Sequence, residues 1–76
     1  MSDFPFMKLS LGTAIRVTEG RLKMTDQDVA DELGVKEGTV RHWKTGNHVP
    51  LYRLIKPLQA LAKRANVEIS PESMMR

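Results

Sequence analysis

Between residues 26 and 64 of this 76-residue chain, the charged side chains are sorted into two blocks. Residues 26–37 carry five acids, Asp26, Asp28, Asp31, Glu32 and Glu37, with Lys36 as the one cation among them. Residues 38–64 contain cations and no acid: Arg41, Lys44, Arg53, Lys56, Lys63 and Arg64. Cations without neighbouring acids suit an anionic partner such as nucleic acid, although the net charge is only +3. The alternative is that these cations merely coat two solvated helix faces.

Side-chain types that support metal binding or catalysis are sparse. The chain has no cysteine, which excludes disulfides and thiolate sites, and its two histidines, His42 and His48, have no third ligand beside them. Ser10, Ser70 and Ser73 lack a nearby constellation of His and Asp, and the glycines are scattered singly. We therefore expect no enzyme, no cofactor, no metal and no small-molecule ligand.

The length predicts a single small domain. A chain of this size hides only about 60% of its surface on folding, which leaves little room for a deep substrate cavity. We divide it into an N-terminal arm, residues 1–8, and one domain, residues 9–76. The start lacks the basic and apolar regions of a secretion signal, and no stretch approaches the length of a membrane span. The sequence thus predicts a cytoplasmic protein without membrane contact.

Apolar periodicity predicts an all-α fold of four to five short helices. The predicted helices cover residues 9–22, 25–33, 36–45 and 51–65, with a last short helix from residue 70. Pro57 is expected to kink or split the fourth, because proline removes a backbone donor. Residues 67–69 alternate in polarity, so a short strand that pairs across a dimer is the alternative there.

Local signals define a tight turn between the second and third helices. Thr25 and Asp28 have the spacing of a capping box, which starts the second helix. Gly34 fits a left-handed C-terminal cap, after which Val35 packs back on the helix. Trp43 is expected in the core, three residues after an apolar valine on the same helical face.

Eleven residues together carry a resemblance to a known family: Thr25, Gln27, Ala30, Leu33, Gly34, Val35, Thr39, Val40, Trp43, Gly46 and Pro50. Over residues 11–74 the chain resembles the lambda-repressor-like helix-turn-helix family of the Cro and XRE type. The resemblance implies helix-turn-helix DNA binding at the second and third helices, with the second helix of the unit, residues 37–43, in the major groove. It also implies a small phage or prophage repressor, associated with the nucleoid of a bacterial or phage-infected cell.

By this resemblance, the base-reading positions fall on Glu37, Gly38, Thr39, Arg41 and His42. Arg41 has the fork that matches guanine O6 and N7, Glu37 can accept from the cytosine amino group, and the Thr39 methyl can contact thymine. For Gly38 the alternative is an ordinary first-turn irregularity, and for His42 it is an exposed surface histidine.

The family's phosphate contacts fall on another set of positions: Gln27, Lys36, Asn47, His48 and Arg53. Lys36 stands at the N-cap of the third helix, where a cation opposes the helix dipole unless a phosphate offsets it. Asp26 stands where the family often has a glutamine bonded to phosphate. A carboxylate there repels the DNA backbone unless it serves as an internal cap.

A second departure concerns an ion pair. Family members commonly pair an arginine late in the first helix with a glutamate just after the base-reading helix. The corresponding residues here are Glu19 and Lys44, so the charges look exchanged. We predict a structural ion pair of reversed sign; the alternative is two independent solvated side chains.

The resemblance implies a sequence-specific transcriptional regulator, a Cro-like repressor, that binds a palindromic double-stranded DNA operator as a homodimer. The dimer candidates are Val67, Ile69, Met74 and Met75, with closure of the core as their alternative role. The alternative function is a helix-turn-helix protein-interaction module, such as an antitoxin-like or anti-repressor partner, whose acidic block meets a protein. Asp26 and the modest net charge favour that alternative.

Overall fold

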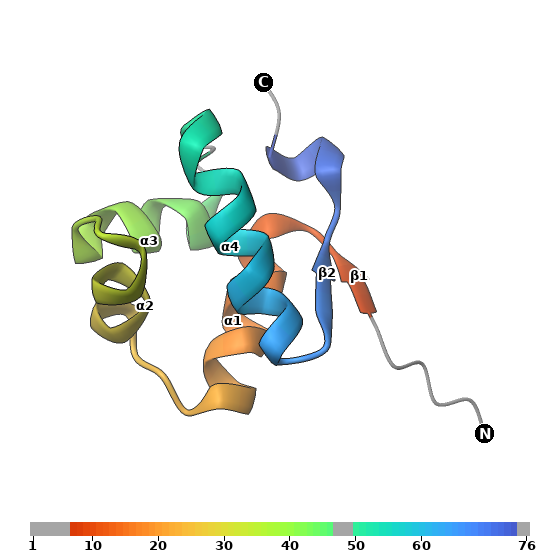
Figure 1. Ribbon diagram of the computed structural model, residues 1–76, viewed down its shortest axis with the longest axis horizontal. Helices are drawn as coiled ribbons and strands as arrows, with labels where there is room; N and C mark the ends of the chain where they lie inside the picture. Colours follow the sequence, from red (N-terminus) through yellow and green to blue (C-terminus); the bar gives the residue numbers. More distant parts are fainter. Residues whose placement is uncertain (1–6, 47–49, 75–76) are drawn as a thin grey trace.

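The computed structural model describes residues 7–46 and 50–74. Its elements, in chain order, are β1 (Met7–Leu9), α1 (Leu11–Leu22), α2 (Asp26–Leu33), α3 (Glu37–Thr45), α4 (Tyr52–Arg64), β2 (Val67–Ile69) and the 3-10 turn η1 (Pro71–Met74). Figure 1 shows α2 and α3 at one end of the molecule, the two strands at the other, and α1 and α4 between them. The predicted all-α class, with four short α-helices, is confirmed.

The two strands form the main addition to the expected helices. Val67–Ile69 is a strand, as in the alternative considered for this segment, but its partner is β1 of the same chain. The strands run parallel, with Met7 opposite Val67 and Leu9 opposite Ile69, and the Ser70 N–H donates to the Leu9 carbonyl oxygen at 2.7 Å. Residues 7 and 8, assigned to the arm, therefore belong to the folded domain.

The end of the chain also differs from the prediction. The expected last helix is only the short turn η1. The chain reverses at Asn66, between α4 and β2. Asn66 has a φ of 59°, in the left-handed region that asparagine tolerates better than most residues. Residues 1–6 of the predicted arm, together with Asn47, His48 and Met75, lie outside the described residues.

The core lies where α1 and α4 meet the other elements. Val40 and Trp43 are fully buried in it, as predicted. Val67, Ile69 and Met74 are buried as well, at 0%, 2% and 3% exposure. These three dimer candidates thus close the core of a single chain, and their side chains are not available as a surface between two copies.

Pro57 was expected to kink or split the fourth helix; it does not split it, since α4 runs from Tyr52 to Arg64 as one helix. Pro57 is exposed, whereas Leu54, Leu58 and Leu61 are buried on both sides of it. Burial of a leucine side chain contributes about 2 kcal/mol, so this apolar face outweighs the loss of one backbone hydrogen bond.

Gly12 marks a close approach between two helices that the sequence did not indicate. A Cβ at Gly12 would lie 2.6 Å from the Lys44 carbonyl oxygen, so the start of α1 contacts the backbone at the end of α3 directly. A Cβ at Gly20, in the same helix, would meet no atom of the described residues within 4 Å. Only the first of these two glycines is required by packing.

We expect Gly12→Ala to destabilise the fold by about 1–3 kcal/mol, because the added methyl forces α1 away from backbone atoms. The matched control, Gly20→Ala, should stabilise the fold by up to about 1 kcal/mol through helix propensity. Thermal unfolding followed by circular dichroism measures both. Equal effects of the two substitutions would contradict the close approach.

Candidate nucleic-acid interface

The helix pair α2–α3 is held by the local interactions that its sequence predicts. The Thr25 hydroxyl accepts from the Asp28 N–H at 3.1 Å, and the Asp28 carboxylate accepts from the Thr25 N–H at 2.9 Å. Gly34 ends α2 at a φ of 72°, and the Val35 N–H donates to the Ala30 carbonyl oxygen at 2.9 Å. Ala30 is fully buried, which lets α3 lie close to α2. The turn therefore fixes how α3 lies on the domain.

All five predicted base-reading residues lie on α3, away from its buried side. Arg41 and His42 are exposed, while Glu37, Gly38 and Thr39 are partly exposed. The Arg41 Nη2 donates to Glu37 Oε1 at 3.1 Å, one helical turn back. The outward surface of α3 thus combines a guanidinium, a carboxylate, a hydroxyl and an imidazole.

The structure brings Arg53 next to two residues of the turn and α3 that precede it by more than ten positions. Lys36, Thr39 and Arg53 line one open groove of about 290 Å³ between the turn, α3 and the start of α4. Leu51 and Trp43 line it as well. Two of the predicted phosphate-binding residues, Lys36 and Arg53, therefore share a surface with a predicted base-reading residue.

Gln27 behaves differently from these two cations. It is exposed on α2, and its amide donates to the Asp31 carboxylate at 2.7 Å, along the helix. Gln27 does not line the groove that Lys36 and Arg53 share.

The helix starts near this groove leave backbone N–H groups without side-chain caps. The N-cap residues of α3 and α4, Lys36 and Leu51, make no side-chain capping hydrogen bond, and the first turn of α4 has no acid. The start of α2, in contrast, is satisfied by its capping box. Helix N-termini carry partial positive charge and bind anions through these N–H groups. The groove accordingly combines two such termini with two cationic side chains.

The predicted ion pair between Glu19 and Lys44 is present, and it has a third member. Lys44 Nζ lies 2.9 Å from Glu19 Oε1 and 2.7 Å from Asp26 Oδ1. The three side chains are only 10–17% exposed. The network connects the last turns of α1 and α3 with the first residue of α2. Asp26, whose position conflicted with a phosphate contact, is thus bonded internally.

Burial and the hydrogen bonds within this network, which has one cation for two carboxylates, shift the pKa values of all three side chains. Burial raises the pKa of Glu19 above its ordinary 4.5, and its hydrogen bond to Asp26 acts in the same direction. The hydrogen bond from Glu19 lowers the pKa of Asp26 below 3.8, and Lys44 lowers it further. The pKa of Lys44 is raised above 10.5, chiefly by its hydrogen bond to Asp26. As the pH falls, Glu19 therefore takes up a proton before Asp26.

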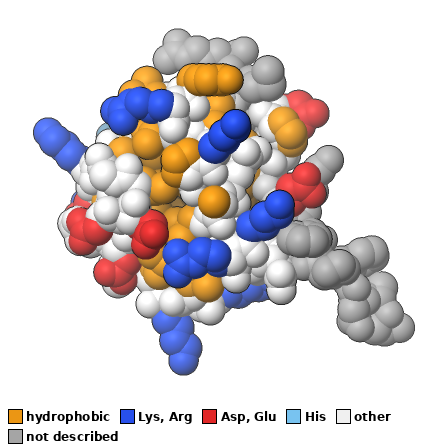
Figure 2. All heavy atoms as spheres, viewed as in Figure 1, with side chains coloured by type: hydrophobic (Ala, Val, Ile, Leu, Met, Phe, Trp, Pro, Cys, Tyr) orange, Lys and Arg blue, Asp and Glu red, His pale blue; other side chains and the backbone are white. Residues whose placement is uncertain are grey.

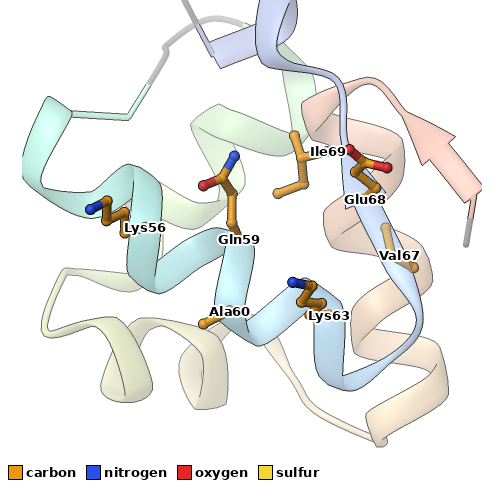
Figure 3. A pocket seen from close by; sticks show the side chains of 7 residues that line it. All are labelled: Lys56, Gln59, Ala60, Lys63, Val67, Glu68 and Ile69. Atoms are coloured by element: carbon orange, nitrogen blue, oxygen red, sulfur yellow. The ribbon is translucent and has the colours of Figure 1, made fainter.

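A larger groove, of about 530 Å³, lies between α4 and β2. Figure 3 shows Lys56, Gln59 and Lys63 extending from α4 on one side of it and Glu68 on β2 on the other. None of its lining residues comes from α2 or α3. On the face seen in Figure 2, acidic side chains gather over α2 and basic ones are spread over α4. The two groups of charges are nevertheless linked, because Asp26 pairs with Lys44, Glu32 with Arg64 and Glu37 with Arg41.

Comparisons of the chain with protein-family models, curated proteins and solved structures give no match. Across residues 7–46 and 50–74, no three His, Cys, Asp or Glu side chains are grouped so that they could hold a metal ion. Within the same ranges, every helix is too short or too polar to cross a membrane.

We expect Asp26→Asn and Glu19→Gln to change stability with opposite pH dependence. The lowered pKa of Asp26 means that its carboxylate stabilises the fold above pH 3.8 and loses this contribution as the pH falls through its folded value. The raised pKa of Glu19 means that its contribution is complete below pH 4.5 and is lost as the pH rises through its folded value.

As the pH rises from about 2 to 7, Asp26→Asn should therefore lose stability relative to the wild type, and Glu19→Gln should gain stability relative to it. Urea denaturation at a series of pH values measures both differences. Two differences that change with pH in the same direction would contradict the shared network.

Proposed function

We propose that this protein is a sequence-specific double-stranded DNA-binding transcriptional regulator of the lambda-repressor-like helix-turn-helix type. In this proposal α3 enters the major groove, and the starts of α3 and α4 bind the phosphate backbone. The observation that carries it is the groove in which Lys36 and Arg53 meet two uncapped helix N-termini beside Thr39. A phosphate in this groove would offset the unfavourable cation at the N-cap of α3.

The bonds of Asp26 weaken the alternative of a protein-interaction module. That alternative relied on a carboxylate in a position that faces phosphate in the family. Here the Asp26 carboxylate lies 2.7 Å from Lys44 Nζ, which gives it an internal role and compensates its charge. The start of α2 then contributes less to DNA binding than in the family, and the starts of α3 and α4 contribute more.

Gly38 adds a second argument for a ligand close to α3. A Cβ at this position would meet nothing within 4 Å, so packing inside the described chain does not require a glycine there. Glycine nevertheless costs about 1 kcal/mol relative to alanine in a helix. A duplex whose backbone approaches α3 closely supplies a reason for this cost.

The proposed regulator acts as a homodimer, because one α3 helix covers only a few base pairs and a two-fold dimer doubles the length of the site. With Val67, Ile69 and Met74 buried, other residues must form the contact between copies. Among the described residues, Leu51 and Tyr52 are the large apolar side chains that stay exposed, at 60% and 89%. They replace the three buried candidates. Met75, the fourth candidate, lies outside the described residues and remains one.

Selection from a random duplex library at physiological salt tests the proposal. We expect an enriched palindrome whose half-sites lie about 34–36 Å apart, with an affinity that falls steeply as salt increases. Arg41→Ala should lose one base preference by about tenfold or more, whereas the control Arg64→Ala should keep the sequence preference, because Arg64 lies on α4 and pairs with Glu32. No enrichment and a shallow salt dependence would contradict DNA binding and direct attention to the acids of α2.

A further inference from the structure

Glu37 and Arg41 form one unit on the outward surface of α3. Their side chains are joined at 3.1 Å between Oε1 and Nη2, and they are 43% and 63% exposed. Glu37 is the first residue of α3, and Arg41 follows one turn later. The bond to Glu37 thus holds the Arg41 guanidinium beside the first turn of α3.

We propose that Glu37 is a positioning residue for Arg41 and does not itself contact a base, an inference that rests on the DNA-binding function proposed above. A guanidinium has five N–H donors, and the bond to Glu37 uses one of them. The exposed donors that remain are sufficient for the fork onto guanine O6 and N7. The pair therefore assigns guanine to the base opposite Arg41.

The charge of Glu37 supports this role over direct contact with cytosine. A carboxylate that leaves its cation would face the phosphates alone, which is unfavourable. When the Glu37 carboxylate stays bonded to Arg41, its charge is neutralised by the guanidinium. The bond also restricts the arginine side chain before binding, so fewer conformations are lost when DNA binds. The preference for guanine then depends on two residues, of which only Arg41 touches the base.

The test compares base preferences selected by the wild type, Glu37→Gln, Arg41→Ala and the double variant from one random duplex library. The position of interest is the guanine whose preference Arg41→Ala abolishes. We expect Glu37→Gln to weaken the preference at that same position by about threefold to tenfold, a fraction of what a complete bidentate contact gives. In the Arg41→Ala background it should add nothing.

Glu68→Gln is the matched control, because it removes the same charge from an exposed residue on β2. It should change overall affinity at most and leave every base preference in place. Circular dichroism and thermal unfolding verify that all variants remain folded.

Results that contradict the role of Glu37 can be distinguished from results that contradict DNA binding. If Glu37→Gln alters the preference at another base, or has the same effect without Arg41, Glu37 contacts a base directly and the inference is wrong. A wild-type motif that Glu37→Gln leaves unchanged also rejects the inference but leaves the proposed function intact. A wild type that selects no sequence rejects the proposed function, and this inference with it.

Discussion

The arrangement of the helices depends on one ammonium group. Lys44 Nζ bonds the carboxylates of Glu19 and Asp26, and through them the end of α3 is tied to the end of α1 and the start of α2. Partly buried charges are costly to leave unpaired, so an α3 shifted along the domain would lose both bonds without replacement. The backbone of the same residue contacts Gly12. Lys44 thus fixes α3 by its side chain and by its main chain.

This constraint also determines which charges remain for a partner. Asp26 and Asp28 are bonded within the domain, the first to Lys44 and the second to the start of α2. Lys36 and Arg53 remain exposed beside helix starts that have no acidic side-chain cap. A net charge of +3 is modest for a DNA-binding protein, but its distribution matters more than its sum. Two acids near α3, Asp26 and Glu37, each have a cationic partner within the domain, Lys44 and Arg41.

Sequence reasoning succeeded where the signal is local. The capping box at Thr25, the left-handed Gly34 and the buried Trp43 each depend on residues within a few positions, and all three are present. The ion pair of Glu19 with Lys44 connects distant positions, and it was predicted from a departure from the family's charge pattern.

The remaining features are set by tertiary contacts. The pairing of residues 7–9 with 67–69 joins the two ends of the domain, and no short-range pattern fixes its register. Gly12 differs from Gly20 only in what lies opposite it. Asp26 was recognised as a misfit, but its partner became evident only from the packing of α2 against α3. In the sequence, the apolar residues Val67, Ile69 and Met74 fit either a core or an interface between copies. The structure shows that they are buried in the core.

The central claim is that α3 and the starts of α3 and α4 form the DNA-binding surface. Amide chemical shifts of the ¹⁵N-labelled protein, recorded while a random-sequence duplex of about 20 base pairs is added at low salt, test it most directly, since non-specific binding uses the same phosphate contacts. The account predicts that the largest changes fall in residues 36–42 and at Tyr52 and Arg53. Changes concentrated in α2, or along the groove between α4 and β2, would contradict it.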